Sequence, residues 1–346
     1  MTGGCGFVGS NVAARLHQEG WRVTLFDNLG RHGAADNLQW LLKAGNLEFV
    51  HGDTRNANDV DRLVERSQPS AVFHLAGQVA MTTSMDNPRR DFETNVGGSI
   101  NVLESVRRHA RKAAVVYASS NKVYGELRGV ALKEEALRYT APSLPEGIDE
   151  SAPLDFQTPY GCSKGAADQY MLDYARVFGL NTVVFRHSTI FGGRQFATFD
   201  QGWIGWFCQQ ALAAKQNPQR EPFTISGDGK QVRDLLFVDD AVNCYLAAAE
   251  KITEVRGEAF NIGGGMSNSC SLLELFNILE RLLELELEYR RLPWRHSDQK
   301  FFVADIAKAR RMLGWQPKLS REEGIGLMLD WVKRSGGVAG SSTQAL

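Results

Sequence analysis

The stretch Gly3-Gly4-Cys5-Gly6-Phe7-Val8-Gly9 decides the fold that this sequence predicts. Its outer glycines recur at every third position, and apolar residues with helical spacing follow them. Such a run favours a tight turn whose backbone N–H groups approach a pyrophosphate at the N-terminus of a helix. A glycine-rich surface turn is the alternative. The predicted cofactor-binding residues of this turn are Gly3, Gly6, Phe7 and Val8.

The next segment, residues 21–27, is typical of a strand that ends in a carboxylate. Asp27 lies 18 residues after Gly9, close to the ~20 residues at which a dinucleotide-binding fold places an acid on the ribose hydroxyls. A carboxylate there repels a 2′-phosphate, so the sequence favours NAD over NADP, although Arg31 leaves NADP open. We expect Asp27 and the following Asn28 to contact the cofactor.

One strand of the predicted fold is nearly missing. A dinucleotide-binding sheet has a buried apolar strand before the glycine turn, and here only Met1 and Thr2 precede it. Without that strand, its two neighbours would keep unpaired backbone groups. The sequence therefore suggests a start internal to the natural reading frame or a truncated chain, which in-frame apolar codons upstream would reveal.

Strand-like segments at residues 47–50, 71–75, 113–117 and 181–185 alternate with helical patterns. This alternation predicts an α/β fold, a Rossmann-like doubly wound parallel sheet with a smaller C-terminal α/β substrate-binding region. Ligands of such sheets bind at the carboxyl ends of the strands. The further cofactor-binding candidates, near these ends or on the helix predicted at 93–109, are Asp53, Thr54, Leu75, Ala76, Gly77, Gln78, Asn95, Ser119 and Arg186.

A candidate acid/base unit combines Ser120 with Tyr160 and Lys164. Positions i and i+4 share one face of a helix, so Tyr160 and Lys164 project together. We expect the ammonium to draw the pKa of the phenol, about 10 when free, toward working pH. Ser120, at a strand end, would share the substrate proton. Taken alone, the Tyr-x-x-x-Lys spacing is common by chance and also fits a surface pair.

Composition excludes other classes of function. The 346 residues carry a net charge of -1, which gives no electrostatic footprint for nucleic acid or an anionic membrane. No apolar run approaches the ~20 residues of a membrane span. The five cysteines are scattered without Cys-x-x-Cys spacing, which predicts no metal site, no disulfide framework and a cytoplasmic location.

The sequence also suggests how the chain is divided. Residues 1–187, with 234–260 returning to them, form the predicted NAD-binding domain, and 188–233 with 261–335 form the substrate-binding region. The turn-rich stretch 126–158 is predicted to be a surface loop with a lid-like role. Residues 223–229 have the pattern of a hairpin arm. Residues 336–346 lack core-forming side chains and are expected to be a disordered tail.

The ordered set of the glycine turn, Asp27, Asn95, Ser119-Ser120 and Tyr160/Lys164 resembles the extended short-chain dehydrogenase/reductase family, over essentially residues 3–335. This family contains nucleotide-sugar epimerases, dehydratases and decarboxylases. The resemblance implies a tightly bound NAD cofactor, a nucleotide-sugar substrate, and proton and hydride chemistry carried by Tyr160, Lys164 and Ser120.

Within the family, residues 120–125 (Ser-Asn-Lys-Val-Tyr-Gly) lack the acidic pair of the sugar 4,6-dehydratases, so water elimination is not expected. These residues, with 77–84 and 193–208, are instead similar to the branch of 2-epimerases that act on CDP-sugars. Trp294 and His296 depart from that branch, which has a smaller residue and a glutamate there.

The resemblance implies C2 epimerisation through a transient keto sugar, with hydride returned to the opposite face. We expect the guanidinium groups of Arg194 and Arg233 to hold the diphosphate, unless they form surface ion pairs. The alternative roles are a helix cap for Asp298, loop solvation for Asn121 and Lys122, and a structural histidine for His187. The substrate-binding candidates are Thr82, Ser84, Asn121, Lys122, His187, Arg194, Gln201, Arg233 and Asp298.

Two other functions remain open at this stage. The same trio serves C2 and C4, so an epimerase of a UDP- or GDP-sugar fits the chemistry as well. A catalytically silent NAD-binding sensor or scaffold is the alternative from a different class. By resemblance we expect a homodimer or homotetramer that forms through the helices near 95–109 and 160–178.

Overall fold

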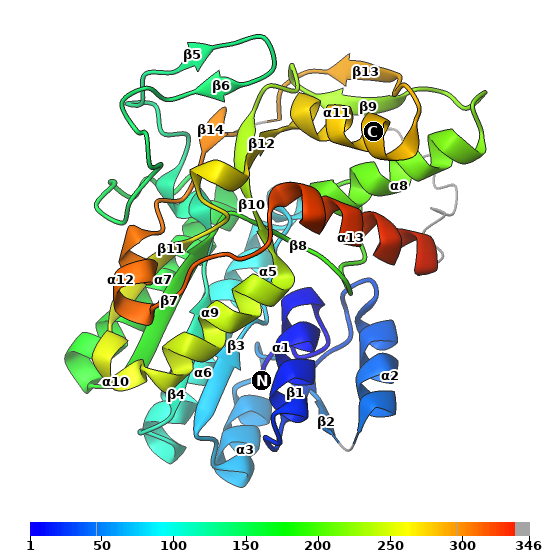
Figure 1. Ribbon diagram of the computed structural model, residues 1–346. Coiled ribbons are helices and arrows are strands. Elements are labelled where there is room, and N and C mark those ends of the chain that lie inside the picture. Colours follow the sequence, from blue (N-terminus) through cyan, green and yellow to red (C-terminus); the bar gives the residue numbers. More distant parts are fainter. Residues whose placement is uncertain (46, 296, 336–346) are drawn as a thin grey trace.

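The structure is a computed structural model that describes residues 1–45, 47–295 and 297–335 (Figure 1). The predicted tail 336–346 and His296 lie outside these residues. A parallel sheet forms the centre of the fold, as the alternating pattern predicted. Its strands, in spatial order, are β2 (Glu48–His51), β1 (Thr24–Asp27), β3 (Ala71–His74), β4 (Ala114–Ala118), β7 (Asn181–His187) and β11 (Glu258–Ile262).

Met1 and Thr2 occupy the position between β1 and β3. Thr2 bridges in parallel to Phe26 and to His74. Its N–H donates to the carbonyl of Phe73 at 3.1 Å, and its own carbonyl accepts from the N–H of Leu75 at 3.1 Å. These bonds join the two halves of the sheet near its carboxyl edge, so the pairing that we expected to be lost is present there. The glycine turn leaves the sheet at this point.

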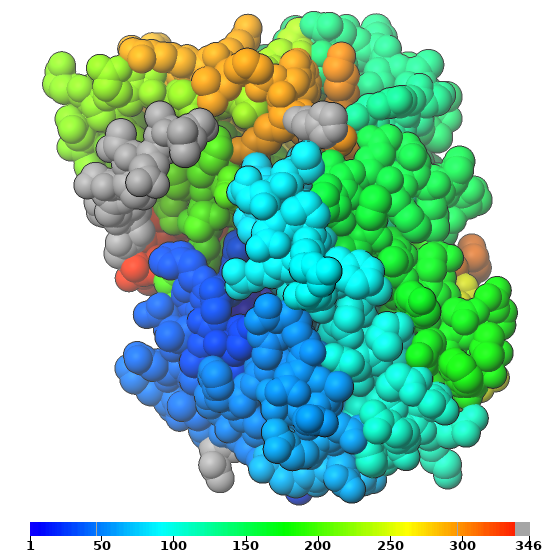
Figure 2. Space-filling model, turned by 180° about the vertical axis from the view of Figure 1, so that it is seen from behind, coloured from blue at the N-terminus to red at the C-terminus, as the bar shows by residue number. Residues whose placement is uncertain are grey.

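Helices cover both faces of the sheet. One face carries α1 (Phe7–Gln18), α2 (Ala34–Ala44), α9 (Val238–Glu250), α10 (Ile252–Val255) and α12 (Ala307–Leu313), and the other carries α3 (Ala57–Ser67), α6 (Gly98–His109) and α7 (Thr158–Phe178). From behind, the cyan and green segments around α6 and α7 lie side by side (Figure 2). Successive residues of β4 point to opposite faces, so Val115 and Val116 belong to two different buried clusters.

A second group of elements lies beyond the carboxyl edge of the sheet. Its strands are β8 (Thr189–Phe191), β9 (Phe223–Ser226), β10 (Val232–Phe237), β12 (Ser269–Ser271), β13 (Tyr289–Leu292) and β14 (Phe301–Phe302), and its helices are α8 (Trp203–Gln216), α11 (Leu272–Leu283) and α13 (Arg321–Arg334). β10 pairs with β8, β12 and β14. β9 pairs in parallel with β13, so the predicted hairpin arm is wrong: its partner comes from a segment far along the chain.

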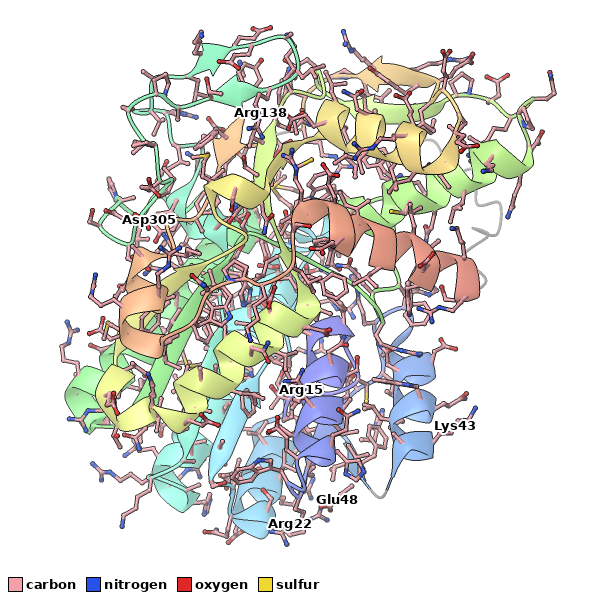
Figure 3. The ribbon with its side chains drawn as sticks, in the orientation of Figure 1. Arg15, Arg22, Lys43, Glu48, Arg138 and Asp305 are labelled. Atoms are coloured by element: carbon pink, nitrogen blue, oxygen red, sulfur yellow. The ribbon has the colours of Figure 1, made fainter. Side chains whose placement is uncertain are left out.

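The stretch 126–158, predicted to be a surface loop with a lid-like role, runs mostly over the surface up to the start of α7, and none of its residues lines the cavity described below. It contains β5 (Lys133–Glu134) and β6 (Tyr139–Thr140), which pack against the second group of elements. The Tyr139 hydroxyl donates to Asp228 at 2.6 Å, and Arg138 pairs with Glu274 of α11 at 3.0 Å (Figure 3). Buried apolar residues such as Ile148 fix this stretch to the protein body.

The remaining short elements are α4 (Met81–Asp86), α5 (Pro88–Phe92), the π-helical turn η1 (Glu93–Gly97) and the 3₁₀ turns η2 (Asn121–Tyr124) and η3 (Met266–Asn268). η1 and α6 together cover the helix predicted at 93–109. The domain boundaries proposed from the sequence stay a prediction.

Candidate active site

One cavity of about 560 Å³ runs from the glycine turn to the second group of elements. Its walls come from the carboxyl ends of β1, β2, β3, β4 and β7, and on the far side from β8 to β10, Arg295 and Asp298. The predicted site residues in its lining are Gly3, Gly6, Phe7, Val8, Asp27, Asn28, Asp53, Thr54, Leu75, Ala76, Gly77, Ser119, Ser120, Asn121, Lys122, Tyr160, Lys164, His187, Arg194, Gln201, Arg233 and Asp298. Thr82, Ser84, Gln78, Asn95 and Arg186 are not in the lining.

The glycine turn leaves no room for a side chain at Gly3 or Gly9. Gly3 has a φ of 65°, and a Cβ there would lie 2.6 Å from the backbone nitrogen of Ala76. A Cβ at Gly9 would overlap the carbonyl oxygen of Gly3. α1 begins after Gly6 without a side-chain cap, so its first N–H groups have no intrahelical partner. The turn therefore has the geometry of an anion-binding helix start.

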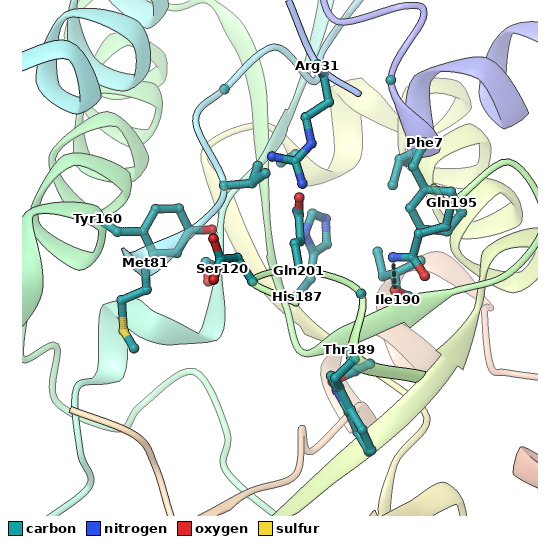
Figure 4. Close-up of a pocket in the computed structure, with 18 of the residues that line it drawn as sticks. Phe7, Arg31, Met81, Ser120, Tyr160, His187, Thr189, Ile190, Gln195 and Gln201 are labelled. Atoms are coloured by element: carbon teal, nitrogen blue, oxygen red, sulfur yellow. Dashed lines mark hydrogen bonds between the residues drawn. The ribbon is translucent and has the colours of Figure 1, made fainter. Parts of the chain in front are cut away.

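Asp27 and Asp53 place two carboxylates at the glycine end of the cavity. Asp27 accepts hydrogen bonds from the N–H groups of Cys5 (3.0 Å) and Leu29 (2.8 Å), and burial raises its pKa. Asp53 is bonded to Asn28 at 2.9 Å, and its hydrogen bonds with Arg55 hold its pKa below the usual range. Arg31 points into the cavity (Figure 4).

Asn95 and Gln78 support the cavity wall from behind. The Asn95 side chain donates to the carbonyl of Gln78 (3.1 Å) and to the hydroxyl of Ser163 (2.9 Å), and accepts from the N–H of Gln78 (2.9 Å). The side-chain amide of Gln78 folds back onto the backbone of Ala80. Asn95 thus fixes the loop after β3 to the helix that carries Tyr160.

Tyr160 projects from α7 toward Ser120 at the end of β4 (Figure 4). Burial raises the pKa of Tyr160 to about 12, and its hydrogen bond with Ser120 opposes this shift. The direction is opposite to our sequence-based expectation, because loss of solvent outweighs any nearby cation. Lys164 donates to the carbonyl of Ala118 and lies 4.3 Å from the ring centre of Tyr117. Burial lowers the pKa of Lys164 to about 7.

Arg186 belongs to a buried network beneath the cavity. Its guanidinium makes two 2.9 Å bonds to the carboxylate of Asp168 and a third 2.9 Å bond to the hydroxyl of Tyr124. Asp168 also accepts from Ser119 at 2.8 Å. The structure therefore gives Arg186 a supporting position where the sequence predicted a cofactor contact.

The opposite end of the cavity is built from long polar side chains. Asp298 accepts from Arg233 at 2.9 Å and lies 3.6 Å from the ammonium of Lys122. Burial lowers the pKa of Lys122 to about 8, while Asp298 raises it. Asn121 donates to the buried side chain of Gln299 at 2.9 Å. These side chains come from segments that are far apart in the sequence.

Arg194, His187 and Gln201 lie between the two ends. The guanidinium of Arg194 is 4.3 Å from the ring centre of Trp40, and its backbone has a φ of 70°. The Nε2 of His187 is bonded to the hydroxyl of Tyr245, and burial lowers the pKa of His187 to about 3, so its imidazole is neutral. Gln201 lines the centre of the cavity (Figure 4).

The described part of the chain shows no helix that is long and apolar enough to span a membrane. In the same residues, no group of three or more His, Cys, Asp or Glu side chains is placed to hold a metal ion.

The sequence profile of the NAD dependent epimerase/dehydratase family matches residues 1–263. The chain belongs to this family. Among its relatives, a CDP-paratose 2-epimerase from Salmonella typhi is 57% identical over 331 residues, which are 96% of this chain and 98% of that protein. A putative UDP-glucose 4-epimerase from Methanocaldococcus jannaschii is 31% identical over 97% of this chain and 98% of that protein.

Solved structures of this epimerase/dehydratase family share the fold. The UDP-glucose 4-epimerase of Thermotoga maritima with UDP-glucose has a TM-score of 0.82 at 29% identity, covering 96% of this chain and 98% of its own. The UDP-glucose 4-epimerase of Thermus thermophilus in complex with NAD has a TM-score of 0.78 at 26% identity, covering 97% and 98%.

Sequence reasoning missed part of the cavity wall of this family member. Val79 and Met81 line it, although the polar Thr82 and Ser84 were predicted. Arg295 also lines it, with its guanidinium 3.3 Å from the hydroxyl of Ser226. The only feature of the sequence that indicated Val79 and Met81 was the run of apolar residues before Thr82. Trp294 packs on Gly227 outside the lining, so this departure from the 2-epimerase pattern does not enter the cavity.

Proposed function

We propose that this chain is an NAD-dependent nucleotide-sugar epimerase that interconverts CDP-paratose and CDP-tyvelose by inverting C2. One observation carries the proposal: a single cavity joins the glycine turn, the Tyr160–Ser120 pair and the Lys122–Asp298–Arg233 cluster. The 57% identity to a CDP-paratose 2-epimerase supports the choice of substrate.

The residues of the glycine end fit NAD. Uncapped N–H groups of α1 suit the pyrophosphate, and the carboxylate of Asp27 suits a ribose with a free 2′-hydroxyl. Asn28, Asp53, Thr54 and the loop Leu75–Ala76–Gly77 would complete the cofactor contacts. When bound, NAD supplies the hydride acceptor for the oxidation and returns the hydride, so it is regenerated in each turnover.

Tyr160 is the proposed proton carrier. As a phenolate, Tyr160 would take the proton of the C2 hydroxyl during oxidation, and it would return that proton during reduction, while Ser120 holds the same oxygen. Lys164 would hold the nicotinamide ribose. The 2-keto sugar would rotate before reduction, so that the hydride returns to its opposite face and C2 is inverted. Asn121 and Lys122 would contact the sugar, and Arg194 and Arg233 the diphosphate.

A defined set of substrates tests the proposal. The protein is incubated with CDP-paratose, CDP-tyvelose, UDP-glucose and a GDP-hexose, and the configurations at C2 and C4 are followed by NMR. Interconversion of the CDP pair is expected. Inversion at C4 alone would replace the proposal with the activity named for the 31% identical relative. No turnover of any sugar would favour a silent NAD-binding protein.

The proposal also covers the cellular location, the pathway and the oligomeric state of the enzyme. We place it in the cytoplasm, in the synthesis of a surface-polysaccharide sugar, as a homodimer or homotetramer. The exposed apolar side chains of Tyr170 and Val177 on α7 support association through that helix.

A further inference from the structure

The cavity wall around Tyr160 is polar on one side and apolar on the other. Asn121, Lys122 and Asp298 provide amide, ammonium and carboxylate groups on the polar side. The opposite side comes from the start of α4, where Val79 and Met81 line the cavity. Figure 4 shows Met81 next to Tyr160 in the cavity wall.

Hydrogen bonds fix Met81 relative to Tyr160. The hydroxyl of Ser84 donates to the carbonyl of Met81 at 2.6 Å and accepts from the N–H of Tyr160 at 3.2 Å. α4 packs against α7 along this contact. The hydroxyl oxygen of Thr82 is buried and takes no part in the lining. The part of α4 next to Tyr160 therefore lines the cavity with the apolar side chain of Met81, whereas Thr82 and Ser84 take no part in the lining.

The chemistry of a pyranose says which carbon meets this wall. The neighbours of C2 are C1 and C3, and C1 carries the diphosphate that the arginines on the far side would hold. When Tyr160 bonds the C2 oxygen, C3 is the next carbon on the side away from the diphosphate. A hydroxyl at C3 would then be enclosed by Val79 and Met81 without a hydrogen-bond partner, which costs binding.

We propose that Met81, together with Val79, selects a sugar that is deoxygenated at C3 over the same sugar with a C3 hydroxyl. This inference rests on the proposed function and names the substrate feature that its site prefers. The flexible methionine side chain can also follow the ring through its two orientations, because it is unbranched and has three rotatable bonds.

The test compares two substrates that differ in one oxygen atom. CDP-paratose and CDP-6-deoxyglucose share every substituent except the C3 hydroxyl, and CDP-3-deoxyglucose, which adds only the C6 hydroxyl, tests the second deoxygenated carbon. The measured quantity is kcat/KM for inversion at C2, followed by NMR. We expect the wild-type protein to prefer CDP-paratose over CDP-6-deoxyglucose by about 10–100-fold, the range available to an apolar pocket.

Three variants separate this role from a general effect on the site. Met81→Gln keeps the length of the side chain but adds hydrogen-bonding groups, and is expected to reduce the preference by about tenfold. Met81→Leu, an apolar control of similar volume, is expected to keep the ratio of the two kcat/KM values. Val79→Thr exchanges a methyl group for a hydroxyl and is expected to reduce the preference for CDP-paratose. This variant tests the inference even if a Met81 variant does not fold.

The outcomes are distinguishable. If the wild-type protein does not convert CDP-paratose, the proposed function and this inference both fail. If it converts CDP-paratose but Met81→Gln and Val79→Thr keep the wild-type ratio, only the inference fails. It also fails if Met81→Leu lowers the ratio as much as Met81→Gln does.

Discussion

The two ends of the cavity are built in different ways. The glycine end uses backbone: the turn 3–9, an uncapped helix start and the loops after β2 and β3. The opposite end uses the side chains of Lys122, Arg233 and Asp298, which three distant segments supply. Backbone geometry leaves a pattern in the sequence because only glycine fits it, whereas a side-chain cluster forms only when the fold joins its segments.

The charges of the two ends differ as well. Asp27 and Asp53 provide carboxylates at the glycine end, where Arg55 pairs with Asp53. The opposite end holds one carboxylate, Asp298, between two cations, which leaves net positive charge for a diphosphate. The carboxylates of the first end therefore suit ribose hydroxyls, and the cations of the second end suit phosphate groups.

The largest effect is expected at Tyr160, where the two ends meet. Tyr160→Phe should lower kcat by about 10²–10⁴-fold, because it removes the proposed proton carrier. NAD content, measured by chromatography after denaturation, should stay near the wild-type value. Turnover that survives in this variant would show that another group transfers the proton, and loss of NAD would show that the two ends are not separable.

The next effect concerns the network beneath both ends. Asp168→Asn leaves the buried guanidinium of Arg186 without its charge partner and should lower the free energy of unfolding by about 3–5 kcal/mol. The exposed pair Arg281–Glu322 is the matched control, and Glu322→Gln should cost no more than about 1 kcal/mol. Urea unfolding measures both. Equal losses would contradict the supporting role of Arg186.

A smaller effect is expected in the glycine turn. Gly9→Ala forces a Cβ against the carbonyl of Gly3 and should destabilise the fold by about 1–3 kcal/mol, with lower NAD content. Gly326→Ala, in α13, meets nothing within 4 Å and should be neutral or stabilising by up to about 1 kcal/mol. Thermal unfolding and NAD content would show whether only the first glycine is required.

The last effect, small at each pH step, concerns Asp234, which follows Arg233 in β10. Burial raises the pKa of Asp234 from 3.8 to about 6. The folded state therefore binds this proton more tightly than the unfolded chain does. The contribution of Asp234 to stability is full below about pH 4 and is lost as pH rises through 6, on the order of 1 kcal/mol per pH unit. Asp234→Asn should remove this slope in urea unfolding between about pH 4 and 6. If Asp234→Asn keeps the wild-type dependence of the free energy of unfolding on pH, the raised pKa of Asp234 is contradicted.

Much of the fold was predictable from local pattern. The strands that end at Asp27 and before Asp53, the helix of Tyr160 and the glycine turn follow from spacing and glycine placement, and the structure contains them. The mistakes have long-range causes. Residues 126–157 gave no signal of β5 and β6, because prolines and turns dominate them, and the burial of Tyr139 and Ile148 depends on distant segments. β9 found a distant parallel partner rather than a hairpin.

The sequence by itself determined the parts that one short segment can encode, namely the glycine turn, the acid at the end of β1 and the shared face of Tyr160 and Lys164. Only the tertiary structure decided which side chains meet. It placed Arg186 on Asp168, enclosed Tyr160 so that its pKa rises, and put Met81 in the cavity wall where Thr82 and Ser84 were expected. The physical reason is that burial and pairing depend on every segment packed around a group, and no single segment contains that information.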